Sequence, residues 1–286
     1  MITLLLLTVM TFNIHHGEGR DGQLSLQRIA AVIESADIVA LQEVDRHWSE
    51  RSNLVDQAEW LAGKLNRYYV FAPNLDLDGS TSEEGRIKNS RRQYGVALLS
   101  RYPIQFSRSY PLPKLGAGGQ NPEQRGLLEC QVVIPEFGLS RDQAKGTRAA
   151  ARLLRVYVTH LSHASMAERL LQVQRIREIL ERAQLTGSPY VGVDMADSWV
   201  LLGDFNFKPD SDEYTLLAGA SDSLAKDTWK ITGESEGHTI NLGTEKGARI
   251  DYIFVSSDLA PSVRSARVLH ETNASDHQPV AATLNY

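Results

Sequence analysis

Residues 199–206 read WVLLGDFN, an apolar run that ends in Asp204 and Asn206. A short run of branched and aromatic residues is typical of a buried strand. Polar side chains that directly follow such a strand stand on rigid backbone and can converge on one pocket. Because side chains alternate along an extended chain, Asp204 and Asn206 are expected on the same side of this segment. The stretch therefore predicts a buried strand with two polar groups at its end.

The same pattern occurs at four further places along the chain. The polar groups that end or follow these apolar strands are Asn13 after LLLLTVMTF, Glu43 after DIVALQ, His160 after LRVYVT, and Asp251 with the later pair Asp276 and His277. Taken singly, a carboxylate at a strand end is most often a turn or helix cap, and a lone histidine is usually structural. Residues suited to metal binding or acid–base chemistry occur at all five strand ends, and this favours a common site.

The remaining pattern predicts an α/β chain. Strands are expected near 3–14, 38–41, 94–100, 104–110, 127–134, 153–159, 199–203, 250–256 and 279–284, helices near 24–35, 54–65 and 166–183, and a polar loop at 76–93. No internal repeat and no linker rich in Pro, Gly or Ser divides the chain. We therefore expect residues 1–286 to form a single domain.

Composition narrows the function classes. The chain has 286 residues, 42% of them hydrophobic, and a net charge of -5, which argues against a generic nucleic-acid coat protein because such binding needs surplus Lys and Arg. Two loops are nevertheless basic, with Arg86, Lys88, Arg91 and Arg92 in one and Arg141, Lys145, Arg148, Arg152 and Arg155 in the other. The positive charges of each loop could bind phosphate groups, or the loop could simply be a solvent-exposed surface.

Cysteine content and the N-terminal segment bear on the compartment. The single cysteine, Cys130, excludes an internal disulfide and is expected to be a small buried side chain. The apolar N-terminal segment lacks a preceding Lys or Arg and a small-residue cleavage site, and it is shorter than the ~20 residues of a membrane helix. We expect a cytoplasmic protein without a membrane span, and no protein partner is indicated.

The donor inventory favours a hard cation. Asn, Glu and Asp oxygens without cysteine suit Mg²⁺, with Mn²⁺ or Ca²⁺ as alternatives. Mg²⁺ held by one or two carboxylates keeps coordination positions for a substrate phosphate. The histidine pairs His15–His16 and His160–His163 are weak evidence for zinc, because neither has a third helix-borne ligand.

Seven motifs then point to a known family. They are TFNIHHGEG, ALQEVD, YGVALLSRYPI, VTHLSH, LLGDFN, RIDYIFVS and ASDHQPV. Their order resembles the endonuclease/exonuclease/phosphatase superfamily, with its deoxyribonuclease I-like fold, from Thr11 to Pro279. Within it the chain resembles bacterial metal-dependent hydrolases that begin NIHHG and continue into QEVDR. The resemblance implies a four-layer α/β/β/α sandwich of two mixed β-sheets flanked by helices, with the active site at one edge.

The resemblance also implies a metal centre. Glu43 matches the family's principal Mg²⁺ ligand, and Asn13 would contact the metal or a phosphate oxygen beside it. Asp276 is expected near the metal. Arg125 is a weaker expectation for binding a substrate phosphate, because an arginine before a strand is more often a surface residue. Tyr94, His15 and its neighbour His16 could line the pocket, and packing or loop roles are equally open for them.

Five further residues match the family's catalytic positions. Asp204 resembles the carboxylate that orients or deprotonates the attacking water, and Asn206 would hydrogen-bond the phosphoryl group. His277 would lie over the scissile phosphate, with Asp251 fixing its tautomer and orientation. His160 would donate to a nonbridging oxygen or assist the leaving group.

The substrate is left open between two readings. An abasic-site endonuclease is disfavoured, because that branch commonly has an acidic residue and a tyrosine where this chain has His15 and His160. The chain is expected to be a metal-dependent phosphodiesterase that acts on a phosphate ester, and the basic loops allow a nucleic acid. A phospholipid or small-molecule phosphodiesterase or phosphatase is the alternative. An inactive binding module ranks last, because none of the acidic and histidine positions is missing.

Overall fold

The computed structural model describes residues 5–79, 91–116, 122–135, 151–185, 195–219, 223–241, 243–270 and 273–286. Its strands are β1 (Leu6–Asn13), β2 (Ile38–Arg46), β3 (Tyr68–Asp78), β4 (Arg91–Ser100), β5 (Ile104–Pro111), β6 (Gly126–Pro135), β7 (Ala151–His160), β8 (Trp199–Asp204), β9 (Ala225–Asp227), β10 (Asp251–Ser256), β11 (Val263–Val268) and β12 (Val280–Asn285). Its helices are α1 (Leu26–Ile33), α2 (Gln57–Leu65), α3 (Met166–Leu185), α4 (Asp212–Tyr214) and α5 (Thr228–Thr232), and its shorter turns are η1 (His15–Gly17), η2 (Glu50–Ser52), η3 (Thr215–Gly219) and η4 (Ala260–Ser262).

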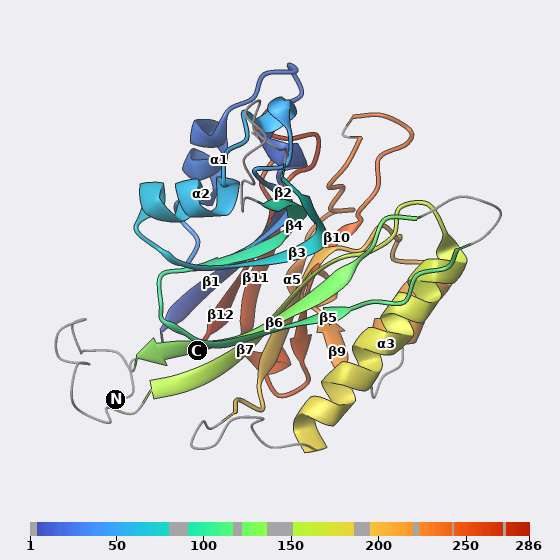
Figure 1. Ribbon diagram of the computed structural model, residues 1–286. Helices are drawn as coiled ribbons and strands as arrows, with labels where there is room; N and C mark the ends of the chain where they lie inside the picture. Colours follow the sequence, from blue (N-terminus) through green and yellow to red (C-terminus); the bar gives the residue numbers. More distant parts are fainter. Residues whose placement is uncertain are drawn as a thin grey trace.

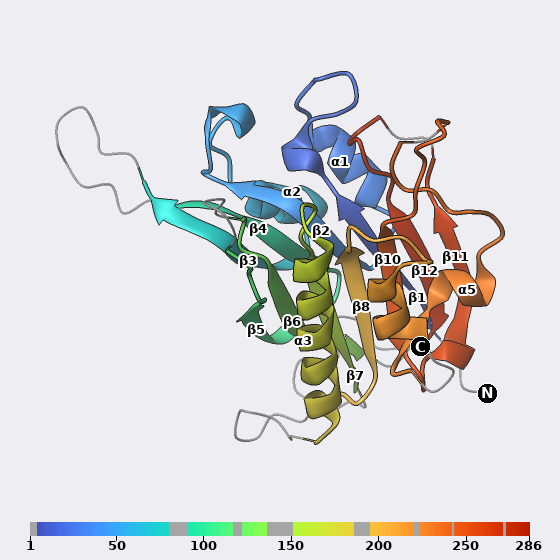
Figure 2. The same cartoon turned by 90° about the vertical axis from the view of Figure 1, so that its right-hand side faces the viewer.

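The strands form two six-stranded mixed sheets. One has the order β11-β12-β1-β2-β4-β3 and the other β5-β6-β7-β8-β10-β9. Helices α1 and α2 cover the outer face of the first sheet, and α3 lies along the second (Figures 1 and 2). The expected four-layer α/β/β/α sandwich is confirmed.

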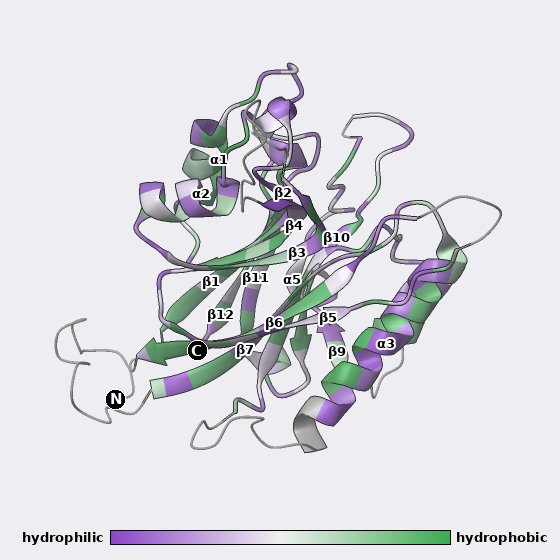
Figure 3. Ribbon diagram, viewed as in Figure 1, coloured by the Kyte–Doolittle hydropathy of each residue, from purple (hydrophilic) through white to green (hydrophobic). Residues whose placement is uncertain are grey.

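Alternation along the strands explains the layers. In β1, Leu7 and Val9 pack between the two sheets, whereas Met10 and Phe12 pack under α1 and α2. In β8, Val200 and Leu202 face the other sheet, and Leu201 packs in the core that includes α3. Because both faces of these strands are buried, their sequences are mostly apolar rather than alternating. Figure 3 shows this as green strands within the molecule, while α3 alternates green and purple.

The strand pairing brings the polar strand ends together. Strands β1 and β2 are parallel, and so are β7 and β8, so that His160 lies directly beside Asp204 in register. Strand β10 is antiparallel to β8 and starts where β8 ends, which places Asp251 on the other side of Asp204. Two neighbouring sheet edges therefore meet at one end of the sandwich.

Several sequence expectations were wrong about element bounds. Strand β2 continues beyond residue 41 to Arg46, with a register shift between Leu41 and Val44, and the helix expected from 54 begins at Gln57. Strands β3, β9 and β11 were not expected, and neither were the short helices α4 and α5. Strand β3 is an edge strand with a proline at a register shift, and its mixed exposure hides the period-2 pattern. The loop expected at 76–93 overlaps the ends of β3 and β4, and residues 80–90 lie outside the described part.

Two other expectations concern single features. Cys130 is fully buried in β6, as expected for a structural cysteine. In the described part of the chain, every helix is too short or too polar to cross a membrane.

Gly203 is required by the close pairing of β7 and β8. A Cβ atom at this position would lie 2.2 Å from the backbone oxygen of Thr159. We expect Gly203→Ala to lower the free energy of unfolding by about 1–3 kcal/mol, because the backbone must move to accept the methyl group. The matched control is Gly63→Ala in α2, where nothing lies within 4 Å, and which should be neutral or stabilising. Urea unfolding of both variants checks this, and equal effects would contradict it.

Candidate functional site

Asn13 joins the two sheets at the centre of the polar cluster. Its Nδ2 donates to Glu43 Oε1 and to Asp204 Oδ2, both at 3.0 Å. Its Oδ1 accepts a hydrogen bond from the backbone N–H of His15 at 3.0 Å, and the residue is wholly buried. Because Glu43 belongs to the first sheet and Asp204 to the second, one amide side chain fixes the spacing between them.

Glu43 is aimed at this cluster by a bulge in β2. The residue lies within the register shift between Leu41 and Val44 and has a φ of 57°. A bulge re-aims a side chain and often lies next to a functional site. Among the described residues, Oε1 accepts the hydrogen bond from Asn13, and Oε2 has no hydrogen-bond donor.

Asp204 and Asn206 form the turn that ends β8. Asp204 Oδ1 accepts from the backbone N–H of Asn206 at 3.0 Å, and Asn206 has a φ of 53°. The Asn206 Nδ2 donates to the carbonyl of Leu161 at 3.1 Å. Burial and the neighbouring Asp251 carboxylate raise the pKa of Asp204 above its usual value. A carboxylate with a raised pKa is suited to accepting a proton near neutral pH.

His277 lies between two carboxylates. Its Nδ1 is 2.9 Å from Asp251 Oδ2, and its Nε2 is 3.7 Å from Asp204 Oδ2. Burial by itself lowers the pKa of His277, but the charges of Asp251 and Asp204 outweigh burial and raise it to about 10. The ring is therefore positively charged at neutral pH in the free protein.

This charge links stability to pH. Because the pKa of His277 rises from 6.5 to about 10 on folding, its protonation stabilises the native state fully below about pH 6.5, and this contribution is lost as the pH rises through about 10. In chelator-treated protein we expect the free energy of unfolding to fall over this window. The fall should be smaller in Asp251→Asn, which removes the largest charge acting on the ring. Urea titrations at several pH values check this, and equal slopes would contradict it.

Arg125 fixes the tautomer of His160. The Arg125 Nη1 lies 3.1 Å from His160 Nδ1, and both side chains are buried. Because a guanidinium only donates, Nδ1 must accept, and the ring proton lies on Nε2, which is 3.5 Å from Asp204 Oδ2. Burial, then Arg125 and His277, lower the pKa of His160 well below 6.5. His160 is therefore a neutral Nε2–H donor that faces the cluster.

The sequence analysis did not connect Arg125 with the groups that hold it. Its Nη1 also donates to Glu123 Oε1 at 2.8 Å, and its Nη2 lies 3.3 Å from His163 Nδ1. Two sequence signals could have revealed them: the i, i+2 spacing of Glu123 and Arg125 just before β6, and the i, i+3 spacing of His160 and His163.

The other predicted residues lie at the edge of the cluster. Asp276 is half-exposed, and its Oδ1 lies 3.9 Å from His15 Nδ1 and 3.2 Å from Ser275 Oγ. In the described residues it has no hydrogen bond to Glu43 or Asp204. Tyr94 is buried in β4, with the Arg51 guanidinium 5.5 Å from its ring centre. Burial and then the charge of Glu43 raise the pKa of Tyr94, so its hydroxyl stays protonated.

The two basic loops contribute little open positive charge among the described residues. Arg91 and Arg92 bind oxygen atoms of the neighbouring strand β3. Arg155 is buried beside Glu129, and Arg152 lies 4.1 Å from the ring centre of Tyr286. The others, Arg86, Lys88, Arg141, Lys145 and Arg148, lie outside the described residues.

The donors present fit a divalent cation. Ligand atoms of Asp204, Asp251 and His277 lie within 4.8 Å of one another, where a cation would have to replace the proton of His277, and the buried Asp251 Oδ1 has no hydrogen-bond partner. A second such group joins Glu43 with His15 and His16. Burial and then the Arg51 charge lower the pKa of His16, which keeps this ring neutral.

Comparison with known proteins agrees with this geometry. The model of the Endonuclease/Exonuclease/phosphatase family matches residues 10–277, a range that contains Asn13, Glu43, Asp204 and His277. The chain belongs to this family. The resemblance inferred from the motifs is thereby confirmed. Members of the Endonuclease/Exonuclease/phosphatase family are typically metal-dependent phosphoesterases. A search of curated proteins gave no match.

Solved structures share this fold over nearly the whole chain. An endonuclease/exonuclease/phosphatase from Beutenbergia cavernae is 25% identical with a TM-score of 0.71, covering 98% of this chain and 71% of that one. A mannosyl-6-phosphatase from Bacteroides thetaiotaomicron is 19% identical, with a TM-score of 0.66 and coverages of 98% and 100%. The human Nocturnin catalytic domain with bound sulfate is 20% identical, with a TM-score of 0.64 and coverages of 98% and 95%. At these identities the last two show the fold alone.

Proposed function

We propose that this protein is a divalent-metal-dependent phosphoesterase that hydrolyses phosphodiester bonds by direct attack of water, without a covalent intermediate. The supporting observation is the double hydrogen bond of Asn13, which holds Glu43 and Asp204 on either side of one amide. A metal-binding carboxylate and a proton-accepting carboxylate are thereby placed side by side. The Nε2 atoms of His160 and His277 lie 3.5 Å and 3.7 Å from Asp204 Oδ2.

Glu43 would hold the metal, with Asn13 Oδ1 and Asp276 as further oxygen donors. Mg²⁺ is the first expectation, with Mn²⁺ or Ca²⁺ as alternatives. When bound, the ion supplies positive charge that stabilises the phosphate oxygens in the transition state. The Oε2 atom of Glu43, which accepts no hydrogen bond from the described residues, is the oxygen best placed to bind the metal.

Asp204 would orient the attacking water and accept its proton, for which its raised pKa suits it. His277, held by Asp251, would place positive charge and a hydrogen-bond donor beside the phosphoryl oxygens. His160 would donate from Nε2 to a nonbridging oxygen, because Arg125 occupies its Nδ1. Asn206 would donate a hydrogen bond to the phosphoryl group from the amide N–H that does not bind the Leu161 carbonyl.

A small-molecule phosphoesterase is the second candidate, and one observation favours it. A pocket of about 390 Å³ has Lys208 and Arg249 in its wall, and these residues are two positions along the chain from Asn206 and Asp251. Volumes of this size suit small ligands. The described arginines of the basic loops are engaged within the chain, which removes part of the support for a nuclease. One relative of the same fold is a mannosyl-6-phosphatase.

Hydrolysis of bis(p-nitrophenyl) phosphate tests the reaction class, and nicking of supercoiled plasmid tests the substrate. Both are run with Mg²⁺, with Mn²⁺ and with chelator, using wild type, Asp204→Ala and the control Asp258→Ala. Asp258 is exposed and accepts a hydrogen bond from Ser198. Ser198 directly precedes β8, so this pair lies at the opposite end of the strand from Asp204. We expect metal-dependent hydrolysis in wild type and control only. Hydrolysis without nicking would assign small phosphoesters, and no hydrolysis of any phosphoester would overturn the proposal.

A further inference from the structure

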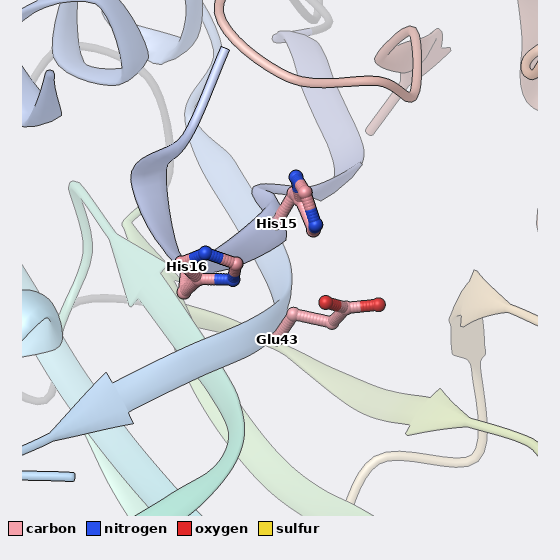
Figure 4. Close-up of side chains that lie close together, drawn as sticks. All are labelled: His15, His16 and Glu43. Carbon is pink, nitrogen blue, oxygen red and sulfur yellow. The ribbon is translucent and has the colours of Figure 1, made fainter. Parts of the chain in front are cut away.

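His15, His16 and Glu43 surround one small space at the edge of the site. One ring nitrogen of each histidine and one carboxylate oxygen of Glu43 all lie within 4.8 Å of one another. Figure 4 shows the two rings, which come from η1, above and beside the Glu43 carboxylate from β2. The ring centres of the histidines are 4.4 Å apart and their planes differ by 61°. Two imidazoles and one carboxylate are thus grouped without a bond among the three.

His16 has one ring nitrogen without a hydrogen-bond partner among the described residues. The residue is 8% exposed, and its Nδ1 is buried with no hydrogen-bond partner. Its Nε2 lies 3.6 Å from Glu18 Oε2. A carboxylate beside one ring nitrogen is the usual arrangement around a metal-binding histidine, because it fixes the tautomer that leaves the other nitrogen unprotonated. A bound ion would satisfy the buried Nδ1.

The backbone of all three residues is in the left-handed region. The φ angles are 44° for His15, 43° for His16 and 57° for Glu43. None is glycine, so each conformation costs about 1–2 kcal/mol. Strain of this kind persists where the surroundings enforce it, and it clusters at active sites and ligand clamps. Three strained residues from two separate segments all present their side chains to the same space.

We propose that His15, His16 and Glu43 form a two-histidine, one-carboxylate site for a first-row transition ion such as Mn²⁺, Fe²⁺, Co²⁺ or Zn²⁺. Imidazole nitrogen binds these ions well, whereas Mg²⁺ prefers oxygen. The inference rests on the proposed function only in that Glu43 is the shared metal ligand. In this site a transition ion would be preferred over Mg²⁺, the ion first expected for the proposed function.

Such a site leaves coordination positions open. Three protein ligands occupy half of an octahedral ion, and the remaining positions can take water or phosphate oxygens. Asp276 Oδ1, 3.9 Å from His15 Nδ1, is near enough to receive a hydrogen bond from a bound water. With two neutral imidazoles and one carboxylate, the loaded site keeps a net positive charge toward an anionic substrate.

Electron spin-echo measurements on bound Mn²⁺ test the ligands directly. We expect imidazole nitrogen modulation in wild type, weaker modulation in His15→Gln and His16→Gln, and Mn²⁺ affinity lowered about tenfold or more in each. His277→Gln should keep the full modulation, which separates this site from the Asp204 cluster. His270→Gln, at an exposed histidine, is the control for surface binding. His15 is partly exposed, so its variant keeps the test valid if His16→Gln does not fold.

Bound Mn²⁺ without nitrogen modulation, or with modulation and affinity unchanged in both histidine variants, would overturn the site. Loss of the modulation in His277→Gln alone would also overturn it, because the ion would then lie in the other cluster. Hydrolysis of bis(p-nitrophenyl) phosphate by wild type is measured in parallel. Modulation without hydrolysis would count against the proposed function alone, and hydrolysis without modulation against this inference alone.

Discussion

Asp204→Asn is expected to lower kcat for phosphodiester hydrolysis by about 10²–10⁴-fold, the usual contribution of a positioned acid or base. The amide keeps the shape of the carboxylate but cannot accept the proton of the attacking water. Because this interaction is made in the transition state, kcat and kcat/KM should fall by the same factor. Steady-state kinetics at saturating metal measure both.

The stability of the same variant separates chemistry from folding. Burial and the neighbouring Asp251 raise the pKa of Asp204, so the ionised carboxylate is disfavoured in the folded protein. Asp204→Asn removes that unfavourable charge, but its NH₂ group must face the N–H of Asn13 or of Asn206, so the free energy of unfolding at pH 8 should fall by about 1–3 kcal/mol. A variant that still unfolds cooperatively and has lost its turnover fits the proposed role. Retained turnover in the folded variant would contradict it.

The position of the site along the sequence could be predicted because burial sets the pattern. Strands β1 and β8 are mostly apolar on both faces, so the amide or carboxylate residue that ends each strand marks the end of the sheet. Asn13 and Asp204 were identified in this way, and the structure brings them into contact. The packing of one sheet against the other could not be predicted, because the alternation of residues within a strand does not show which strand of the other sheet it faces.

The conformation of Glu43 had no sequence signal. A left-handed φ usually indicates glycine, and here packing imposes it on a glutamate within a bulge. The expected strand therefore stopped at residue 41, two residues before the side chain that matters most. Arg125 is a similar case. Its sequence position suggested a surface arginine, yet its burial lets it fix the tautomer of His160.

His277→Gln is expected to lose about as much turnover as Asp204→Asn, in the range of about 10²–10⁴-fold. The ring lies between Asp251 and Asp204, with its Nε2 3.7 Å from Asp204 Oδ2. Glutamine keeps a polar group of similar length but removes the positive charge. Asp251→Asn should lower kcat through His277, because Asp251 is a positioning residue that orients the ring from Nδ1.

The double variant Asp251→Asn/His277→Gln tests whether the pair acts as a unit. If Asp251 works only through His277, the double variant should be no less active than His277→Gln, because residues that act together are not additive. Asp37→Asn is a matched control, since this buried carboxylate accepts from the Thr8 backbone N–H and pairs with Arg101, before the start of β2 and at the opposite end of that strand from Glu43. Losses that multiply in the double variant would instead give Asp251 a role of its own, for which its unpartnered Oδ1 is the available atom.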